Sequence, residues 1–153
     1  MKKEWAVYLD KFIDDLKSIQ PKWTCGRNYQ KSQLKSLSDS RTVIYYANIE
    51  ELLQYTDIGE LSLGELFDGL GNNDVKIAQI ICLWDHGIYL DPPSIFFSTT
   101  FEKVLFSDGR HRTKAAYLLG QKQLPVSIPE QDIIFIKRLF QISKRPFDTK
   151  LTP

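Results

Sequence analysis

The chain has 153 residues, 42% of them apolar, and a net charge of +1, which suits one compact domain over residues 1–153 with a packed core. Composition excludes a membrane helix, because no run approaches the roughly 20 apolar residues of a span, and Met-Lys-Lys-Glu-Trp leads into an amphipathic segment rather than a signal-peptide core. We therefore expect a cytoplasmic protein with no membrane partner.

The first half of the chain is expected to hold helices around one strand. Apolar residues at steps of three and four predict an amphipathic helix over 5–19, and residues 21–39 read as a basic connecting loop. Residues 42–47 are β-branched and aromatic enough for a strand. Short acidic helices are predicted over 49–55 and 61–70.

The middle of the chain predicts a buried helix and a strand pair. Residues 71–74 supply a turn and a helix cap, and residues 75–85 are apolar almost all round, as in a buried helix, which ends at Gly87. Two prolines at 92 and 93 then force an extended entry into a strand over 95–98. A strand over 103–107 follows, and we expect the two strands to pair.

The last third predicts a strand, turn and helix in succession. Asp108 and Gly109 make the turn, residues 110–119 form a helix closed by Gly120, and residues 124–128 form another strand. Residues 131–142 suit a helix or a strand equally, and residues 144–153 are expected to fray.

Charge is distributed unevenly along the chain. Residues 1–47 carry nine Lys or Arg against five acids, residues 48–102 one against ten, and residues 103–153 ten against four. A basic C-terminal third beside an acidic middle favours one face that attracts phosphates, with ordinary solvated charge as the alternative. Cys25 and Cys82 cannot build a metal cage alone, and Cys82 is expected to pack as a small hydrophobic residue.

The segment Phe106-Ser-Asp-Gly-Arg-His-Arg-Thr-Lys-Ala-Ala-Tyr-Leu-Leu-Gly120 predicts an anion site. A helix start leaves backbone N–H groups unpaired and carries partial positive charge, and Gly109 has no side chain to keep a phosphate away. Arg110 and Arg112 add planar forks for phosphate oxygens, and His111 adds N–H donors. Asp108 is out of place beside an anion unless it caps the helix or meets the phosphate through a metal ion.

The same residues resemble the ParB/sulfiredoxin superfamily. Gly109-Arg-His-Arg112, then Ala115-Ala-Tyr and a downstream Leu124-Pro-Val, are similar to its signature, and the likeness spans about 74–128. The resemblance implies an α+β fold, a small mixed sheet flanked by helices. Residues 1–73 would be an N-terminal helical and strand elaboration, 74–129 the core, and 130–153 a C-terminal element and tail.

Sulfiredoxins have Gly-Cys-His-Arg here, and their His and Arg hold ATP phosphates, which implies that role for His111 and Arg112. Arg110 occupies the position of the catalytic cysteine, so the chain is not expected to reduce sulfinic acids. A nucleotide-binding Lys on the preceding helix maps to Lys76, and the other polar contact of that helix maps to Gln79. The alternative for Lys76 is a side chain that merely reaches the surface.

ParB proteins have Gly-Glu-Arg-Arg at this point and bind CTP while clamping DNA, but this chain lacks room for their helix-turn-helix domain. The nearest resemblance is to the plasmid fertility inhibition group, which has Asn-Gly-Arg-His-Arg after a strand and is associated with ATP hydrolysis and DNA cleavage. Asp108 replaces that Asn. Residues 1–73 resemble no family, so the sequence predicts no binding specificity for this part of the chain.

Together these observations predict a phosphate-binding protein of bacterial, plasmid or phage origin. Gly109, Arg110, His111, Arg112, Lys76 and Gln79 would hold a nucleoside triphosphate, ATP or CTP, or a DNA backbone. If the chain is an enzyme, it would be a nucleotide or phosphodiester hydrolase with His111 as acid or base and Asp108 orienting Mg²⁺. No metal site made of protein side chains alone is predicted.

Three alternatives remain open, and one is a nonspecific DNA-binding module, with steep salt dependence and no preference for nucleoside triphosphates. Arg110, His111 and Arg112 would form a solvated first helical turn in a protein that binds no phosphate. A protein-binding inhibitor would instead use the acidic middle and the N-terminal half to block a partner.

Overall fold

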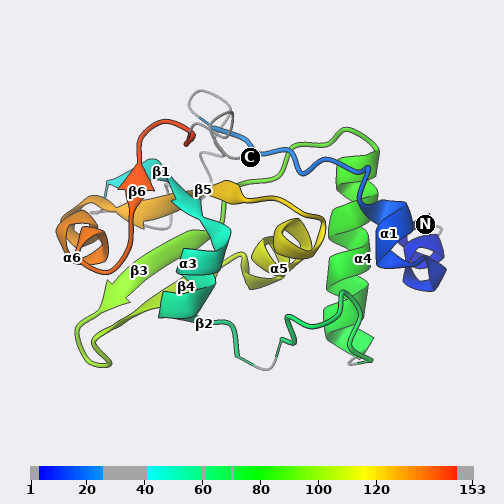
Figure 1. Cartoon of the computed structure of the whole chain (residues 1–153), viewed down its shortest axis with the longest axis horizontal. Helices are drawn as coiled ribbons and strands as arrows, with labels where there is room; N and C mark the ends of the chain where they lie inside the picture. The colour runs from blue at the N-terminus through cyan, green and yellow to red at the C-terminus, as the bar shows by residue number, and fades with distance from the viewer. Residues whose placement is uncertain (1–3, 26–40, 60, 70, 148–153) are drawn as a thin grey trace.

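A computed structural model of the chain describes residues 4–25, 41–59, 61–69 and 71–147. Within these ranges no helix is long and apolar enough to cross a membrane. The expected α+β class is confirmed, since the described residues form one mixed sheet with helices packed against it (Figure 1).

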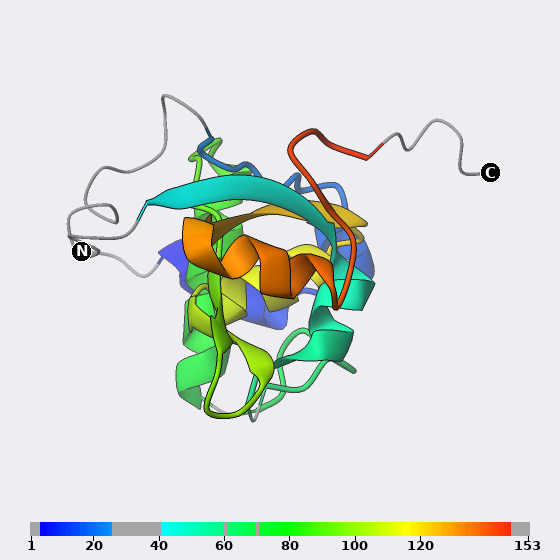
Figure 2. The ribbon, with the colours of Figure 1, turned by 90° about the vertical axis from the view of Figure 1, so that its left-hand side faces the viewer.

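Six strands of the described chain make the sheet, in the order β2-β4-β3-β5-β1-β6. Their bounds are β1 Thr42–Asn48, β2 Thr56–Asp57, β3 Ser94–Ser98, β4 Lys103–Asp108, β5 Gln123–Pro129 and β6 Ile142–Ser143. The longest pairing is antiparallel, between β1 and β5, and places Tyr45 opposite Val126. β3 and β4 form an antiparallel hairpin, as the sequence predicts, which projects from the body of the protein (Figure 2).

The helical elements lie around the sheet (Figure 1). They are the 3₁₀ helices η1 Glu4–Asp10 and η3 Glu130–Asp132, and the α-helices α1 Ile13–Leu16, α3 Ile49–Tyr55, α4 Gly71–Asp85, α5 Arg110–Leu118 and α6 Ile133–Lys137. α4 and α5 lie at the end opposite to α6 (Figure 1). α5 lies between the sheet and α4, and η1 and α1 cover the far side of α4 (Figure 1). The site helix α5 is therefore enclosed by the sheet on one side and by α4 on the other.

The core runs between the sheet and these helices. Ile95, Val126 and Ile128 of the sheet are fully buried in the same core as Ala115 and Ala116 of α5. Trp84 of α4 is 1% exposed, and its ring meets Trp23 edge to face at 5.2 Å. Cys82 is buried and free, which confirms that it packs as a small hydrophobic residue.

Several elements are confirmed within one or two residues of the prediction. β1, α3, β3, β4, α5 and β5 all lie where sequence patterns place them. α4 begins at Gly71 instead of Val75, so the predicted turn is its first turn and the division at residue 73 falls inside the helix. Residues 26–39 of the predicted basic loop lie outside the described residues.

The helix predicted over 5–19 is wrong. A 3₁₀ helix and one turn of α-helix replace it, and Phe12 between them is 80% exposed. In a 3₁₀ helix residues three apart share a face, which brings Tyr8 onto α4. There the Tyr8 hydroxyl donates to the Asp85 carboxylate at 2.5 Å, and burial with this carboxylate raises the pKa of Tyr8.

The helix predicted over 61–70 is also wrong, because residues 61–69 have no helical turn. Gly69 adopts φ +86°, and the Asp74 carboxylate accepts the amides of Asp68 and Gly69 at 2.9 and 3.0 Å. A side chain from α4 therefore satisfies backbone groups that a helix would have used internally.

The C-terminal segment combines both predicted alternatives. Residues 133–137 are helical and Ile142 belongs to β6. Residues 144–147 do not fray, since the Gln123 side chain exchanges two hydrogen bonds with the Phe147 backbone, at 2.7 and 3.0 Å, and residues 148–153 lie outside the described chain.

Candidate phosphate site at the start of helix α5

The turn before α5 requires glycine at position 109. Gly109 is the N-cap of the helix with φ +94°, a conformation that L side chains rarely adopt. A Cβ there would lie 2.6 Å from Pro93 Cα. The pair Pro92-Pro93 and the glycine turn thus pack directly together, which fixes where α5 begins.

The first turn of α5 leaves its amides without helical partners. The first amide bonded inside the helix is that of Thr113, which donates to the Gly109 carbonyl at 2.9 Å, as does the Thr113 hydroxyl. The amides of Arg110, His111 and Arg112 precede it and have no acceptor in the helix. The N-cap glycine has no side chain to cap them, so they remain a partial positive charge at the turn.

A cavity of about 350 Å³ opens beside this turn, between α5 and α4. Its size is within the range of small-molecule sites. Its polar lining brings together most of the residues that the sequence predicts, and its apolar lining was not predicted. The lining residues are Lys76, Gln79, Ile80, Leu83, Leu90, Asp108, Gly109, His111 and Arg112.

Arg112 is the cation most directly associated with the cavity. Its Nη2 atom lies 3.4 Å from Asp108 Oδ2, and 19% of its side chain is exposed against 60% of the Asp108 side chain. The Nε atom of Arg112 is buried and has no hydrogen-bond partner. A buried donor without an acceptor costs about 1–3 kcal/mol, so the Arg112 side chain would gain by turning this donor toward an anion in the cavity.

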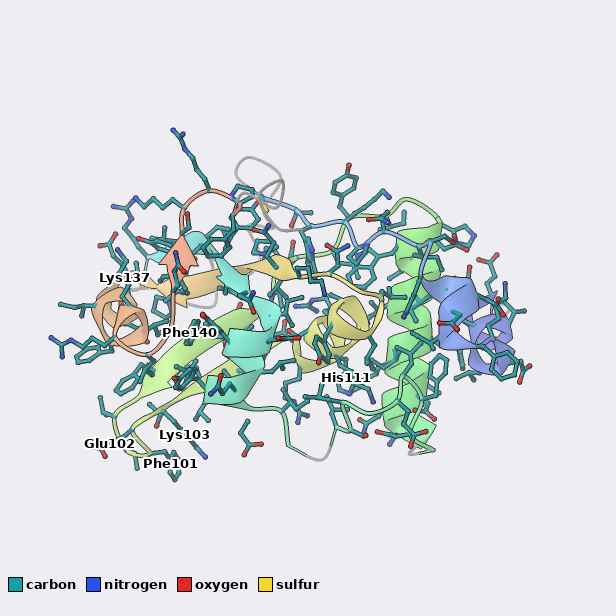
Figure 3. All side chains as sticks on the ribbon, viewed as in Figure 1. Phe101, Glu102, Lys103, His111, Lys137 and Phe140 are labelled. Carbon is teal, nitrogen blue, oxygen red and sulfur yellow. The ribbon has the colours of Figure 1, made fainter. Side chains whose placement is uncertain are left out.

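His111 lies between α5 and α4 (Figure 3). Its Nε2 atom is 2.9 Å from Asn73 Oδ1, an acceptor, so Nε2 carries the proton and Nδ1 is left as the acceptor. Burial, followed by the positive charges of Lys76, Arg110, Lys114 and Arg112, lowers the pKa of His111 to about 4. The ring is therefore neutral at pH 7, first because it is buried and second because four cations lie near it.

Arg110 is placed away from the cavity. Its Nη1 atom donates to the Ile58 carbonyl at 2.9 Å, and a Cβ on Gly59 would lie 2.6 Å from the same atom. Gly59 has φ +68°. Arg110 therefore fastens the 58–59 turn to the helix and does not join the other predicted site residues.

Sequence reasoning missed Lys114, one turn further along α5. Its Nζ lies 3.4 Å from Asp68 Oδ2, with the two side chains 0% and 7% exposed. This buried ion pair fastens residue 68 to α5, as Arg110 fastens residue 58. The residues are 46 positions apart, so no local pattern could have linked them.

Asp108 is the last residue of β4, and its carboxylate faces Arg112 instead of capping α5. Described residues include no group of three or more His, Cys, Asp or Glu able to hold a metal ion. Mg²⁺ is commonly held by one or two carboxylates together with substrate phosphates, and Asp108 at the cavity wall fits that kind of site.

No protein-family model matches this chain, and no curated protein or solved structure matches it either.

Proposed function

We propose that this chain binds the phosphate groups of a nucleoside triphosphate in the cavity between α4 and α5, as a ParB/sulfiredoxin-like protein. One observation carries the proposal: the buried Nε of Arg112, without a partner, beside a helix start whose first amides have no helical acceptor. Lys76, on the facing helix, supplies a second cation to the same cavity. Three kinds of anion-binding group therefore converge on one space.

The apolar part of the lining favours a nucleotide over a bare DNA backbone. Ile80, Leu83 and Leu90 line the cavity beside the cations, and Leu83 is 40% exposed. A base or ribose would remove this surface from water, whereas a backbone phosphate alone would leave it exposed. Gln79 on the same helix provides an amide for a polar edge of the ligand.

Hydrolysis is the reaction that the side chains would support. His111 is neutral and its Nε2 proton is bound to Asn73, so Nδ1 remains as a proton acceptor. Phosphate charge bound in the cavity would raise the low pKa of His111 toward the range that suits a general base. Asp108 would help to hold Mg²⁺, whose chemistry is to neutralise charge on the phosphates. Arg112 would then stabilise phosphate charge at the same wall.

Thermal unfolding with ATP, CTP, GTP and UTP, each with and without Mg²⁺, tests the binding step. A ligand at about 100 times its Kd stabilises the folded state by about 2.7 kcal/mol, which raises Tm by several degrees. We expect at least one nucleotide to do so for the parent chain and for Arg145→Ala, a variant of an exposed arginine outside the cavity. Arg112→Ala should lose the response. A flat response of the parent chain to all four at millimolar concentration would refute the proposal.

The inhibitor alternative gains no support from three acids of the middle region. Asp57 accepts the Gly59 amide at 2.7 Å, Asp74 accepts two loop amides, and Asp68 pairs with Lys114. Each of these carboxylates has a partner within the fold, and that of Asp68 is buried with Lys114. Under the inhibitor hypothesis, biological activity would persist in Arg112→Ala, which separates the two functions.

A further inference from the structure

A second cavity, of about 360 Å³, opens where β3 and β5 separate. The two strands run parallel and pair only at Ser94 and Ser127, and beyond that pair Asp132 of η3 lies beside β3. Ser127 and Asp132 contribute polar groups to the lining, and Ile95, Phe96 and Phe97 contribute strand backbone and apolar surface. This cavity shares no lining residue with the one beside α5.

Pro129 explains why the strands separate. The Ser127 amide donates to the Pro93 carbonyl at 2.8 Å, and the next bond of a parallel ladder would run from residue 129 to the Ile95 carbonyl. Proline has no N–H to donate. The Ile95 carbonyl therefore receives no bond from β5, and Asp132 Oδ2, at 3.1 Å, accepts the Phe97 amide in place of a strand.

Ser127 adds an orphan polar group to this space. Its residue is 1% exposed, and its Oγ atom is buried without a hydrogen-bond partner. A buried hydroxyl without a partner is unfavourable, so a ligand atom that hydrogen-bonds to it would be stabilised.

The charge of the lining sets the class of ligand. Asp132 is the single charged side chain among the residues that line this cavity, and a carboxylate that accepts one amide retains further acceptor capacity. Two cations of adjacent segments are occupied elsewhere: Arg41 pairs with Glu130 at 3.9 Å, and Arg138 lies 6.0 Å from the Phe135 ring. An anion would be repelled here, and a cationic donor would be attracted.

We propose that this cavity is a second binding site, for a primary ammonium group. The Ile95 carbonyl, the Ser127 Oγ and the Asp132 carboxylate provide three acceptors, and an ammonium has three N–H donors. The apolar surface of Phe96 and Phe97 suits the methylene groups that carry it. The site is independent of the proposed nucleotide site, and its ligand has the opposite charge.

Amide chemical shifts in NMR, recorded during titration of the whole chain, test the proposal. Three probes of similar size separate the contributions: n-butylammonium has charge and donors, tetramethylammonium has charge without N–H donors, and n-butanol has no charge. We expect n-butylammonium to shift the amides of Phe97, Ser127 and Gln131, and the other two probes to leave them unchanged. No shift with n-butylammonium, or equal shifts with tetramethylammonium, would overturn the proposal.

Two variants report on the acceptors. Asp132→Asn keeps an acceptor for the Phe97 amide and removes the charge, so it should fold and bind n-butylammonium about tenfold or more weakly. Ser127→Ala should weaken binding as well, yet fold at least as stably as the parent because it removes an unsatisfied hydroxyl. Arg112→Ala, at the other cavity, should bind n-butylammonium as the parent does. Unchanged affinity in Asp132→Asn would contradict the site.

A free amine and a lysine side chain of another protein present the same chemistry, and one further probe distinguishes them. Nα-acetyl-lysine methylamide keeps its side-chain ammonium and carries it on a peptide-like backbone. Equal binding of this probe and n-butylammonium shows that the head group is what the site recognises, as proposed. Tighter binding of the lysine derivative than of n-butylammonium assigns the same head-group site to a partner's lysine, and binding of neither refutes the proposal.

Discussion

The two sides of α5 use similar residues for opposite purposes. On one side Arg110 and Lys114 are committed to the protein itself, to the Ile58 carbonyl and the Asp68 carboxylate. On the other side Arg112 lines a cavity and has a buried donor with no partner. All three are basic residues within two turns of one helix. A basic cluster in a sequence can therefore combine cations that hold the fold together with cations that remain for a ligand.

The largest expected effect is a loss of stability when the ion pair between Lys114 and Asp68 is removed. Lys114→Met keeps the length of the side chain and removes the cation beside a buried carboxylate. Removing one partner of a buried ion pair costs about 3–5 kcal/mol, which urea unfolding would measure. Lys122→Ala, on the exposed surface, should change stability by less than about 0.5 kcal/mol. Equal losses for the two variants would show that Lys114 does not fasten the loop.

Gly109→Ala tests the turn that separates the two sides. Left-handed backbone costs an L residue about 1–2 kcal/mol, and overpacking against Pro93 adds about 1–3 kcal/mol. Chemical unfolding should therefore show a loss of at least about 2 kcal/mol. Gly71→Ala is a useful control, because nothing lies within 4 Å of a Cβ there. If both variants were equally stable, the close approach to Pro93 would not constrain the start of α5.

A paired substitution sharpens the comparison directly. Arg112→Ala should weaken nucleotide binding by about 1.5–3 kcal/mol, roughly 10- to 150-fold, because it removes charged hydrogen bonds to phosphate. Arg110→Ala should instead lower stability by about 1 kcal/mol and leave affinity within a few-fold. Calorimetric titration with urea unfolding of each variant separates the effects. If Arg110→Ala lost affinity and Arg112→Ala lost only stability, Arg110 and not Arg112 would be the arginine that binds the ligand.

The sequence predicted the local features of the site and missed the contacts between distant segments. The strand, the Gly109 turn and α5 are local, so residue spacing alone located them, and Lys76, Gln79, His111 and Arg112 do line one cavity. The role of Arg110 depends on a carbonyl 52 positions away, which no spacing rule encodes. The helix predicted over 61–70 is absent, and the Asp74 carboxylate accepts the amides of Asp68 and Gly69 there, which is another contact that residue spacing does not encode. Contacts between distant segments were what the sequence could not show.

The sequence could not predict the cavity between β3 and β5, because it depends on which strands are neighbours in the sheet. Pro129 at the end of β5 carries no signal of a site until its strand neighbour is known to be β3. The buried state of Ser127 likewise depends on the whole sheet. A proline and a serine in a strand pattern predict an edge or a boundary, and in this fold they mark an interior gap.

The smallest effect concerns pH. His111 is protonated below about pH 6.5 in the unfolded chain but has a pKa of about 4 when folded. Between these values the unfolded state binds more protons, so stability should rise with pH across this window and fall as pH approaches 4. Urea unfolding at several pH values would show this slope, and His111→Gln should flatten it. An unchanged slope in the variant would mean that His111 is not the group responsible.

The central claim is that the first amides of α5, together with Arg112, hold an anion. The most direct test is a titration of the ¹⁵N-labelled chain with a nucleoside triphosphate, followed by NMR at the amides of Arg110, His111 and Arg112. We expect these amides to shift most, the pKa of His111 to rise on binding, and Arg112→Ala to abolish both changes. Saturable shifts confined to other elements, with these three amides unmoved, would contradict it.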